Sequence, residues 1–132
     1  MNRVTARTHA MKLIYEWEMG GEGGEETRLN LLGATPGEEE YAYMERVFAG
    51  VKENIEQIDG LIEQCAVGWK PERIARVDLA ILRLAAYEML AGQTSQNVII
   101  NEAVELARLY SGEKSPQFIH GVLGGVSRSL AQ

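Results

Sequence analysis

The side chains that most often carry enzyme or metal chemistry are few in this chain. There are two histidines, His9 and His120, and neither has a glutamate three residues before it. That spacing is the one with which helices build carboxylate-bridged metal pairs, and zinc sites need more cysteine and histidine than the 132 residues contain. Glu102 and Glu105 share a helix face, but a solvated acidic face explains them better than a site. We therefore predict no catalytic site, no metal and no cofactor.

Binding chemistry remains, and it begins with Arg3 and Arg7. The two residues are four apart in a helix predicted over residues 3–19, so their side chains project from one face. Two arginines on an exposed face can pair with phosphate oxygens or stack on bases. Two ordinary surface charges are the alternative, and the spacing alone favours that interpretation.

The net charge of −6 does not exclude a nucleic-acid partner. The acidity is concentrated between residues 20 and 45, which contain seven glutamates and a single cationic residue, Arg28. The rest of the chain is nearly neutral, so the total charge is weak evidence about partners.

The second predicted helix, of roughly 30 residues, has the clearest apolar pattern in the chain. Thr35-Pro36-Gly37-Glu38 has the residues of a capping box with proline at the first helical position. Apolar residues then follow in steps of three and four: Tyr41, Met44, Phe48, Val51, Ile55, Ile58, Ile62 and Cys65. The pattern predicts one long amphipathic helix and a packed, inert Cys65 thiol. A homodimer formed through this heptad seam is the rival interpretation.

Three more helices are expected after Pro71. Residues 74–90 are apolar almost all round, which is typical of the central helix of a bundle. Residues 98–110 form the next helix, and Ser115-Pro116 provides an N-cap and a first-position proline for the last one. No segment alternates with period two. We predict an all-α fold of about six to seven helices in a single domain, residues 1–132.

The cellular compartment can be inferred from the number of cysteines and from the hydropathy of the chain. One cysteine cannot form an internal disulfide, which favours a reducing cytosol. No segment has the apolar length of a signal peptide core or of a membrane span. We expect a soluble, cytoplasmic protein that does not contact membranes.

Four segments together resemble the NusB transcription-antitermination family. ARTHAMKLIYEWE at residues 6–18 is similar to the opening helix of the family, and RVDLAILRLAAYE at residues 76–88 is similar to its central helix. VIINEAVELA at residues 98–107 and FIHGVL at residues 118–123 resemble the last two helices. The resemblance covers essentially the whole chain in the same order.

The resemblance implies a non-enzymatic RNA-binding protein with two packed three-helix subdomains. Members of the family bind the boxA RNA element of ribosomal operons as a heterodimer with the ribosomal protein NusE. The complex joins an antitermination assembly on RNA polymerase and promotes processive transcription of ribosomal RNA.

Carried over by position, the resemblance also implies site residues. It places Arg3, Arg7, Lys114, Gln117 and Phe118 at the RNA, with Phe118 available for stacking on a base.

The NusE-facing surface would include Tyr15 and Asp78. Tyr15 and Phe118 have a second interpretation as core residues, and Asp78 as a residue that helps its helix to begin.

The basic segment at the start of the first helix is thinner than is common in the family. Val4 and Thr5 interrupt it, so fewer phosphate contacts are expected and RNA binding should depend more on NusE. The alternative function is a helical protein–protein interaction module without RNA binding of its own.

Overall fold

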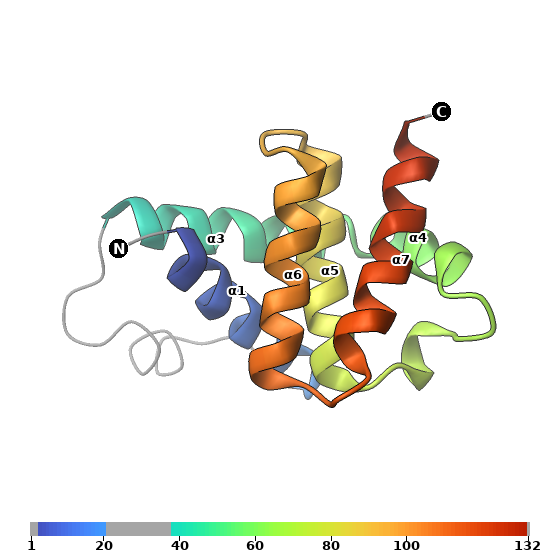
Figure 1. Cartoon of the computed structure of the whole chain (residues 1–132). Coiled ribbons are helices and arrows are strands. Elements are labelled where there is room, and N and C mark those ends of the chain that lie inside the picture. The colour runs from blue at the N-terminus through green and yellow to red at the C-terminus, as the bar shows by residue number, and fades with distance from the viewer. Residues whose placement is uncertain (1–2, 21–37, 132) are drawn as a thin grey trace.

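The computed structural model describes residues 3–20 and 38–131. Within these ranges the chain forms six α-helices, one 3₁₀ turn and no strand, which confirms the all-α prediction (Figure 1). The elements are α1 (Arg3–Glu18), α3 (Glu38–Glu53), α4 (Ile55–Cys65), η1 (Pro71–Arg73), α5 (Arg76–Ala91), α6 (Gln96–Tyr110) and α7 (Ser115–Leu130). None of the described helices is long and apolar enough to cross a membrane.

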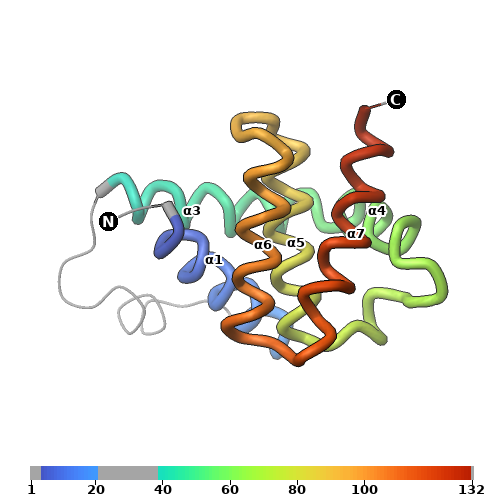
Figure 2. The backbone as a smooth tube through the Cα atoms, viewed as in Figure 1, coloured from blue at the N-terminus to red at the C-terminus, as the bar shows by residue number. Residues whose placement is uncertain are grey.

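Helix α5 is the centre of the arrangement, as its apolar sequence predicts. It contacts every other described α-helix, and its apolar side chains are buried around its whole circumference. Helices α1 and α3 pack against α5 and each other, while α6 and α7 pack together against α5 (Figure 2). Helix α4 lies against α5 and α7. The two groups of helices therefore meet at α5 and share one continuous core.

The chain itself covers most of the predicted heptad seam. Met44, Phe48, Val51, Ile58 and Ile62 are all fully buried in the single chain, while Tyr41 at the start of the seam is 42% exposed. A homodimer is therefore not needed to bury these five residues.

The prediction of one long helix is wrong, because the helix breaks at Asn54. Its side-chain amide donates a hydrogen bond of 2.8 Å to the Gly50 carbonyl, which also accepts from the backbone N–H of Asn54 at 3.1 Å. An asparagine that bonds to the preceding turn competes with the regular helix ladder. The result is two helices, α3 and α4, in place of a single rod of roughly 30 residues.

Helices α3 and α5 approach closely at Gly50. A Cβ atom at this position would lie 2.2 Å from Cε1 of Tyr87, far inside van der Waals contact. The missing side chain of Gly50 thus makes room for the Tyr87 ring between the two helices.

One predicted feature falls partly outside the described residues. The N-cap and proline of the capping box, at residues 35–36, lie there. The predicted N-cap of the last helix is also corrected. Lys114 occupies the N-cap position of α7 without a capping bond from its side chain, and Ser115 is the first helical residue.

Candidate functional site

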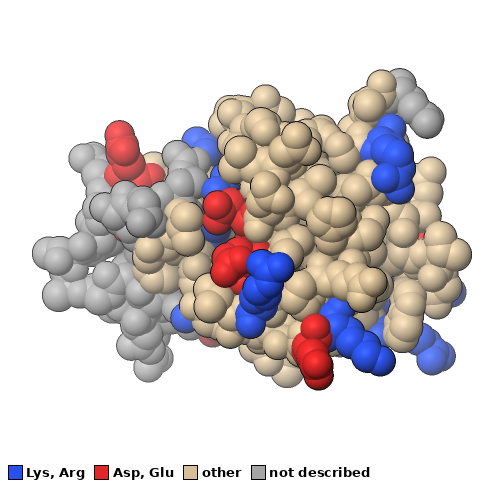
Figure 3. Space-filling view, viewed as in Figure 1, with Lys and Arg blue, Asp and Glu red and all other residues tan. Residues whose placement is uncertain are grey.

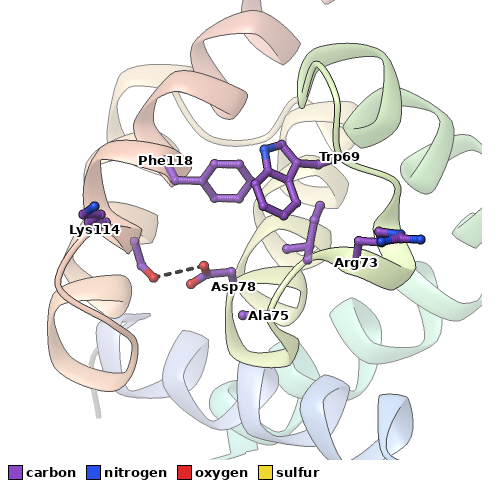
Figure 4. A pocket seen from close by; sticks show the side chains of 8 residues that line it. Trp69, Arg73, Ala75, Asp78, Lys114 and Phe118 are labelled. Atoms are coloured by element: carbon purple, nitrogen blue, oxygen red, sulfur yellow. Dashed lines mark hydrogen bonds between the residues drawn. The ribbon is translucent and has the colours of Figure 1, made fainter.

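An apolar hollow that carries aromatic and cationic side chains lies between η1, the start of α5 and the start of α7. Its volume is about 370 Å³. The residues that line it are Trp69, Arg73, Ile74, Ala75, Asp78, Lys114, Ser115 and Phe118 (Figure 4). We call it the Trp69 pocket.

A tight turn after α4 brings Trp69 to this pocket. Gly68 has a φ of 86°, in the left-handed region that favours glycine, and the Trp69 N–H donates to the Ala66 carbonyl at 2.9 Å. The turn directs the indole toward Phe118 on α7. The two rings meet edge to face, with centroids 6.3 Å apart and planes at 71°. Trp69 remains 51% exposed, so a large aromatic surface is open to a ligand.

The floor of the pocket is polar at one corner. The Ser111 hydroxyl donates to Asp78 Oδ1 at 2.5 Å, and the Ser115 hydroxyl donates to Oδ2 at 3.0 Å. The two serine oxygens are themselves 2.9 Å apart. Asp78 thereby connects the start of α5 to the corner between α6 and α7.

The rim of the pocket is basic. Two exposed cations line it, Arg73 and Lys114. Two more, Lys70 and Arg76, are exposed and directly follow lining residues in the sequence. Two exposed acids, Glu72 and Glu113, partly offset them. Figure 3 shows cationic side chains gathered at the lower right edge of the face formed by α6 and α7, near the start of α7. An anion such as a phosphate would meet a net positive potential here.

The structure brings two of the predicted RNA residues to the pocket. Phe118 is half-buried and contributes one of the two rings, while Lys114 is exposed at the rim (Figure 4). Gln117 is exposed in the first turn of α7, outside the pocket lining.

Arg7 does not lie on an exposed face, and that expectation is corrected. It is 6% exposed, and its Nε donates to both carboxylate oxygens of Glu88 at 3.1 Å. A third contact of 3.0 Å joins Nη2 to Oε2, and the Tyr43 hydroxyl donates to the same carboxylate. The helical spacing gave the correct register but did not reveal that Glu88 faces this arginine from α5. Arg3 is the first residue of α1, and its side chain is not part of what the structure describes.

The start of α1 and the Trp69 pocket are separate places. Arg7 meets α5 at Glu88, ten residues beyond Asp78 in the same helix, which corresponds to roughly 15 Å along its axis. Figure 2 likewise shows the start of α1 and the start of α7 far apart. A single ligand would have to be extended to reach both.

The two predicted partner residues differ in exposure. Tyr15 is half-buried near the end of α1 and packs against the core. Lys12, one turn before it, lies over the ring of the half-exposed Tyr110, 5.2 Å from the centroid. Asp78 is 6% exposed, and both its oxygens accept hydrogen bonds within the chain. A direct contact of Asp78 with a protein partner stays a prediction.

A second buried charge cluster joins three helices away from the pocket. Arg83 on α5 pairs with Asp59 on α4 at 2.8 Å and with Glu18 on α1 at 3.1 Å. The side chain of Glu18 is fully buried. Burial raises the pKa of Glu18 to about 7, and this effect outweighs the opposing influence of Arg83.

The sequence-based selection missed Trp69 and Arg73. Both lie in the segment that interrupts the helical pattern, where periodicity gives no information. A tryptophan flanked by Lys70 and, four residues on, Arg73 was nevertheless a visible signal, because aromatic and cationic residues together suit nucleic acids.

Reactive groups are sparse in the described ranges. Burial raises the pKa of the Cys65 thiol, which keeps it protonated. The described residues contain no group of three or more metal-ligating side chains. The pocket offers instead aromatic stacking surfaces, cations and a hydrogen-bonding carboxylate, which are groups suited to binding a ligand.

Comparisons with known proteins agree on one family. The model described as the NusB family matches residues 4–128. The transcription antitermination protein NusB of Acetivibrio thermocellus is 49% identical over 128 residues, covering 96% of this chain and 88% of that protein.

Solved structures give the same result. NusB of T. maritima superimposes with a TM-score of 0.87 at 30% identity, covering 97% of this chain and 92% of that one. A chain from the crystal structure of antitermination factors NusB and NusE in complex with double-stranded RNA has a TM-score of 0.84 at 24% identity, with 96% of each chain covered. At that identity the second likeness shows the fold.

Proposed function

The chain belongs to the NusB family of antitermination factors, which are not enzymes, and we propose that it works by binding RNA at the Trp69 pocket. The observation that carries this proposal is the pair of aromatic rings, Trp69 and Phe118, surrounded by exposed cations. Unpaired bases stack on aromatic side chains, and phosphates pair with cations. Both kinds of side chain line the same pocket.

The RNA we propose is the boxA element of ribosomal operons, bound together with NusE. The family resemblance supports this choice, and a solved structure of the same fold contains NusB and NusE in complex with double-stranded RNA. Because Arg7 is paired with Glu88, it does not add a free cation at the start of α1 for RNA phosphates. NusE would add RNA-binding surface, and the pair would join the antitermination assembly on RNA polymerase to promote processive transcription of ribosomal RNA.

For NusE we propose the end of the molecule where α1 meets the last turn of α6. Tyr15, Lys12 and Tyr110 lie there, and the neighbouring Leu109 is 65% exposed. Large apolar and aromatic side chains on a surface are typical of protein interfaces. This end adjoins Ser111 and Asp78, so a partner seated there would lie beside the Trp69 pocket.

The test is an anisotropy titration of single-stranded boxA RNA with the native chain and Trp69→Ala, each with and without NusE. Loss of one stacked base costs about 1–3 kcal/mol, so the variant should bind about 5- to 150-fold more weakly. Tyr41→Ala is the matched control, because Tyr41 is comparably exposed on α3, away from the pocket. Equal affinity of Trp69→Ala and the native chain would refute the proposed site.

A protein-only interaction module is the second candidate, favoured by the internal pairing of Arg7 and the net charge of −6. It predicts that NusE binds the native chain and Trp69→Ala equally, and that neither crosslinks to RNA. Crosslinks that depend on Trp69 would exclude it.

A further inference from the structure

We propose that NusE binds along a groove between α1 and α6 as well as at the end of α6, and that it places an apolar side chain beside a basic one in this groove. The inference rests on the NusE site proposed above and extends it toward the start of α1. It is drawn from the side chains that form the walls of the groove: Val4, Thr8, Glu102, Glu105 and Leu109. We call it the α1–α6 groove.

The α1–α6 groove exists because its two helices pack on a third. Helices α1 and α6 each lie against α5, and between them the surface is hollowed. Residues four apart on α1 form one wall, and residues three and four apart on α6 form the other. Arg7 and Leu106 also line the hollow and are only 6% and 5% exposed, so they form its floor.

The rim of the groove is apolar and continuous with the proposed NusE site. Val4 is 47% exposed on one wall, and Leu109 is 65% exposed on the other. Tyr110, next to Leu109, lies under Lys12 in the proposed site. Val4 precedes Lys12 by eight residues, or roughly 12 Å along α1. A partner seated at Tyr110 would therefore cover Val4 by extending a short distance along the groove.

The α6 wall of the groove is acidic. Glu102 is half-buried, and within residues 3–20 and 38–131 no cation pairs with it. Glu105 pairs with the exposed Arg108 on its own helix, and Arg7 on the floor is already paired with Glu88. Figure 3 shows acidic side chains between α1 and α6. A half-buried carboxylate beside an apolar rim would gain from a cation that a partner supplies.

The shape and charge of the groove favour a protein over RNA. Its hollow has a volume of about 20 Å³, against about 370 Å³ for the Trp69 pocket, so the tip of an aliphatic side chain fits and a nucleobase does not. The unpaired carboxylate of Glu102 also repels phosphates. NusE is proposed to share the RNA surface, and a protein that binds phosphates carries lysine or arginine. The acidic groove and a cationic segment of NusE are therefore complementary in charge.

The experiment measures the affinity of NusE for the full-length chain by isothermal titration calorimetry, without RNA, at low and at high salt. Val4→Ser removes an apolar contact and should weaken NusE binding by about fivefold or more. Glu102→Lys places a cation against the basic residue of NusE and should weaken binding by about tenfold or more at low salt. The second loss should shrink at high salt, because screening reduces the repulsion.

Two matched controls make the same changes away from the groove. Val67→Ser changes an exposed valine in the turn after α4, and Glu63→Lys changes an exposed glutamate on α4. Both should bind NusE as the native chain does. Thermal unfolding checks the fold of every variant. If Glu102→Lys does not fold, Glu102→Gln keeps the test decisive, because it should still weaken NusE binding at low salt.

Native affinity for NusE in folded Val4→Ser or in the folded Glu102 variant would overturn the inference. Tyr110→Ala separates this outcome from failure of the proposed NusE site. If Tyr110→Ala alone weakened binding, NusE would sit at the end of α6 and leave the groove free. If no variant weakened it, both sites would be wrong. Tighter binding of boxA RNA by Glu102→Lys with unchanged NusE affinity would assign the groove to RNA and overturn the inference as well.

Discussion

Arg7 and Glu88 form a buried ion pair that holds α1 against the end of α5. Removing one partner of such a pair leaves the other charge buried and unpaired, which costs about 3–5 kcal/mol. We expect Arg7→Ala to lose unfolding free energy of this order in urea denaturation. Its effect on RNA would then reflect unfolding, so Arg3→Ala is the cleaner test of direct contact by α1.

The control for Arg7→Ala is Arg108→Ala. Arg108 pairs with Glu105 at 2.9 Å on the same helix, and both side chains are more than half exposed. Exposed pairs contribute about 0–1 kcal/mol. Similar losses in the two variants would show that the Arg7–Glu88 pair contributes no more than a surface contact.

Glu18 makes the free energy of unfolding decrease as the pH rises, which is unusual for a carboxyl group. Its pKa rises from an ordinary value of 4.5 to about 7 in the folded chain, so the folded state binds this proton more tightly than the unfolded state. The protonated carboxyl therefore stabilises the fold at low pH, and the contribution declines from about 4.5 and is lost as pH rises through about 7.

Glu18→Gln tests this dependence, because the amide keeps an acceptor for Arg83 and does not titrate. We expect the unfolding free energy of the variant, relative to the native chain, to increase between about pH 5 and pH 8. Denaturation curves at several pH values measure this difference. A difference that is flat with pH would show that Glu18 titrates normally.

For single residues, the sequence predicts which types of side chain form the site but not which other residues they contact. Phe118 and Lys114 were selected by resemblance and lie at the pocket. Arg7 was placed on the correct helix, but its burial depends on Glu88, which is 81 residues away in the chain. Trp69 reaches the pocket through the turn at Gly68, a backbone reversal that helical periodicity does not describe.

At the scale of elements, the contact of α3 with α5 depends on the absence of a side chain at Gly50. We expect Gly50→Ala to lose about 1–3 kcal/mol in thermal or chemical unfolding, because its Cβ would overlap the Tyr87 ring. Gly60→Ala is the matched control. It lies in α4 with nothing within 4 Å of the added atom, and alanine there should gain up to about 1 kcal/mol of helix propensity. A Gly50→Ala variant as stable as Gly60→Ala would mean that the helices shift apart without cost.

Most helices could be predicted because their apolar faces repeat at the helical period over three or more turns. The break at Asn54 could not, since the heptad pattern continues through it from Val51 to Ile58 without a missed step. A side-chain hydrogen bond to Gly50 leaves no trace in hydrophobic spacing. The central place of α5 was predictable, because a helix apolar on all sides has no face for solvent.

At the scale of the molecule, an acidic chain that binds RNA must do so through a local basic region. The salt dependence of RNA binding reports how many cations take part. Lys114→Ala should reduce the slope of log K against log salt by about 0.7, the value for one phosphate contact on a single strand. Arg128→Ala is the control, because this exposed residue lies in the last turn of α7, roughly 21 Å along the helix from Lys114. Equal slopes for the two variants would show that charge acts over the whole surface rather than at the pocket rim.

The contact of α5 with every other described helix has a consequence for local opening. A peripheral helix can detach in a partial fluctuation, and its amide protons then exchange with solvent while the rest stays folded. The amides of α5 have no such route, because freeing them requires both groups of helices to separate. We therefore expect hydrogen exchange in the middle of α5 to report the global unfolding equilibrium, with the described helices opening together rather than as two independent halves.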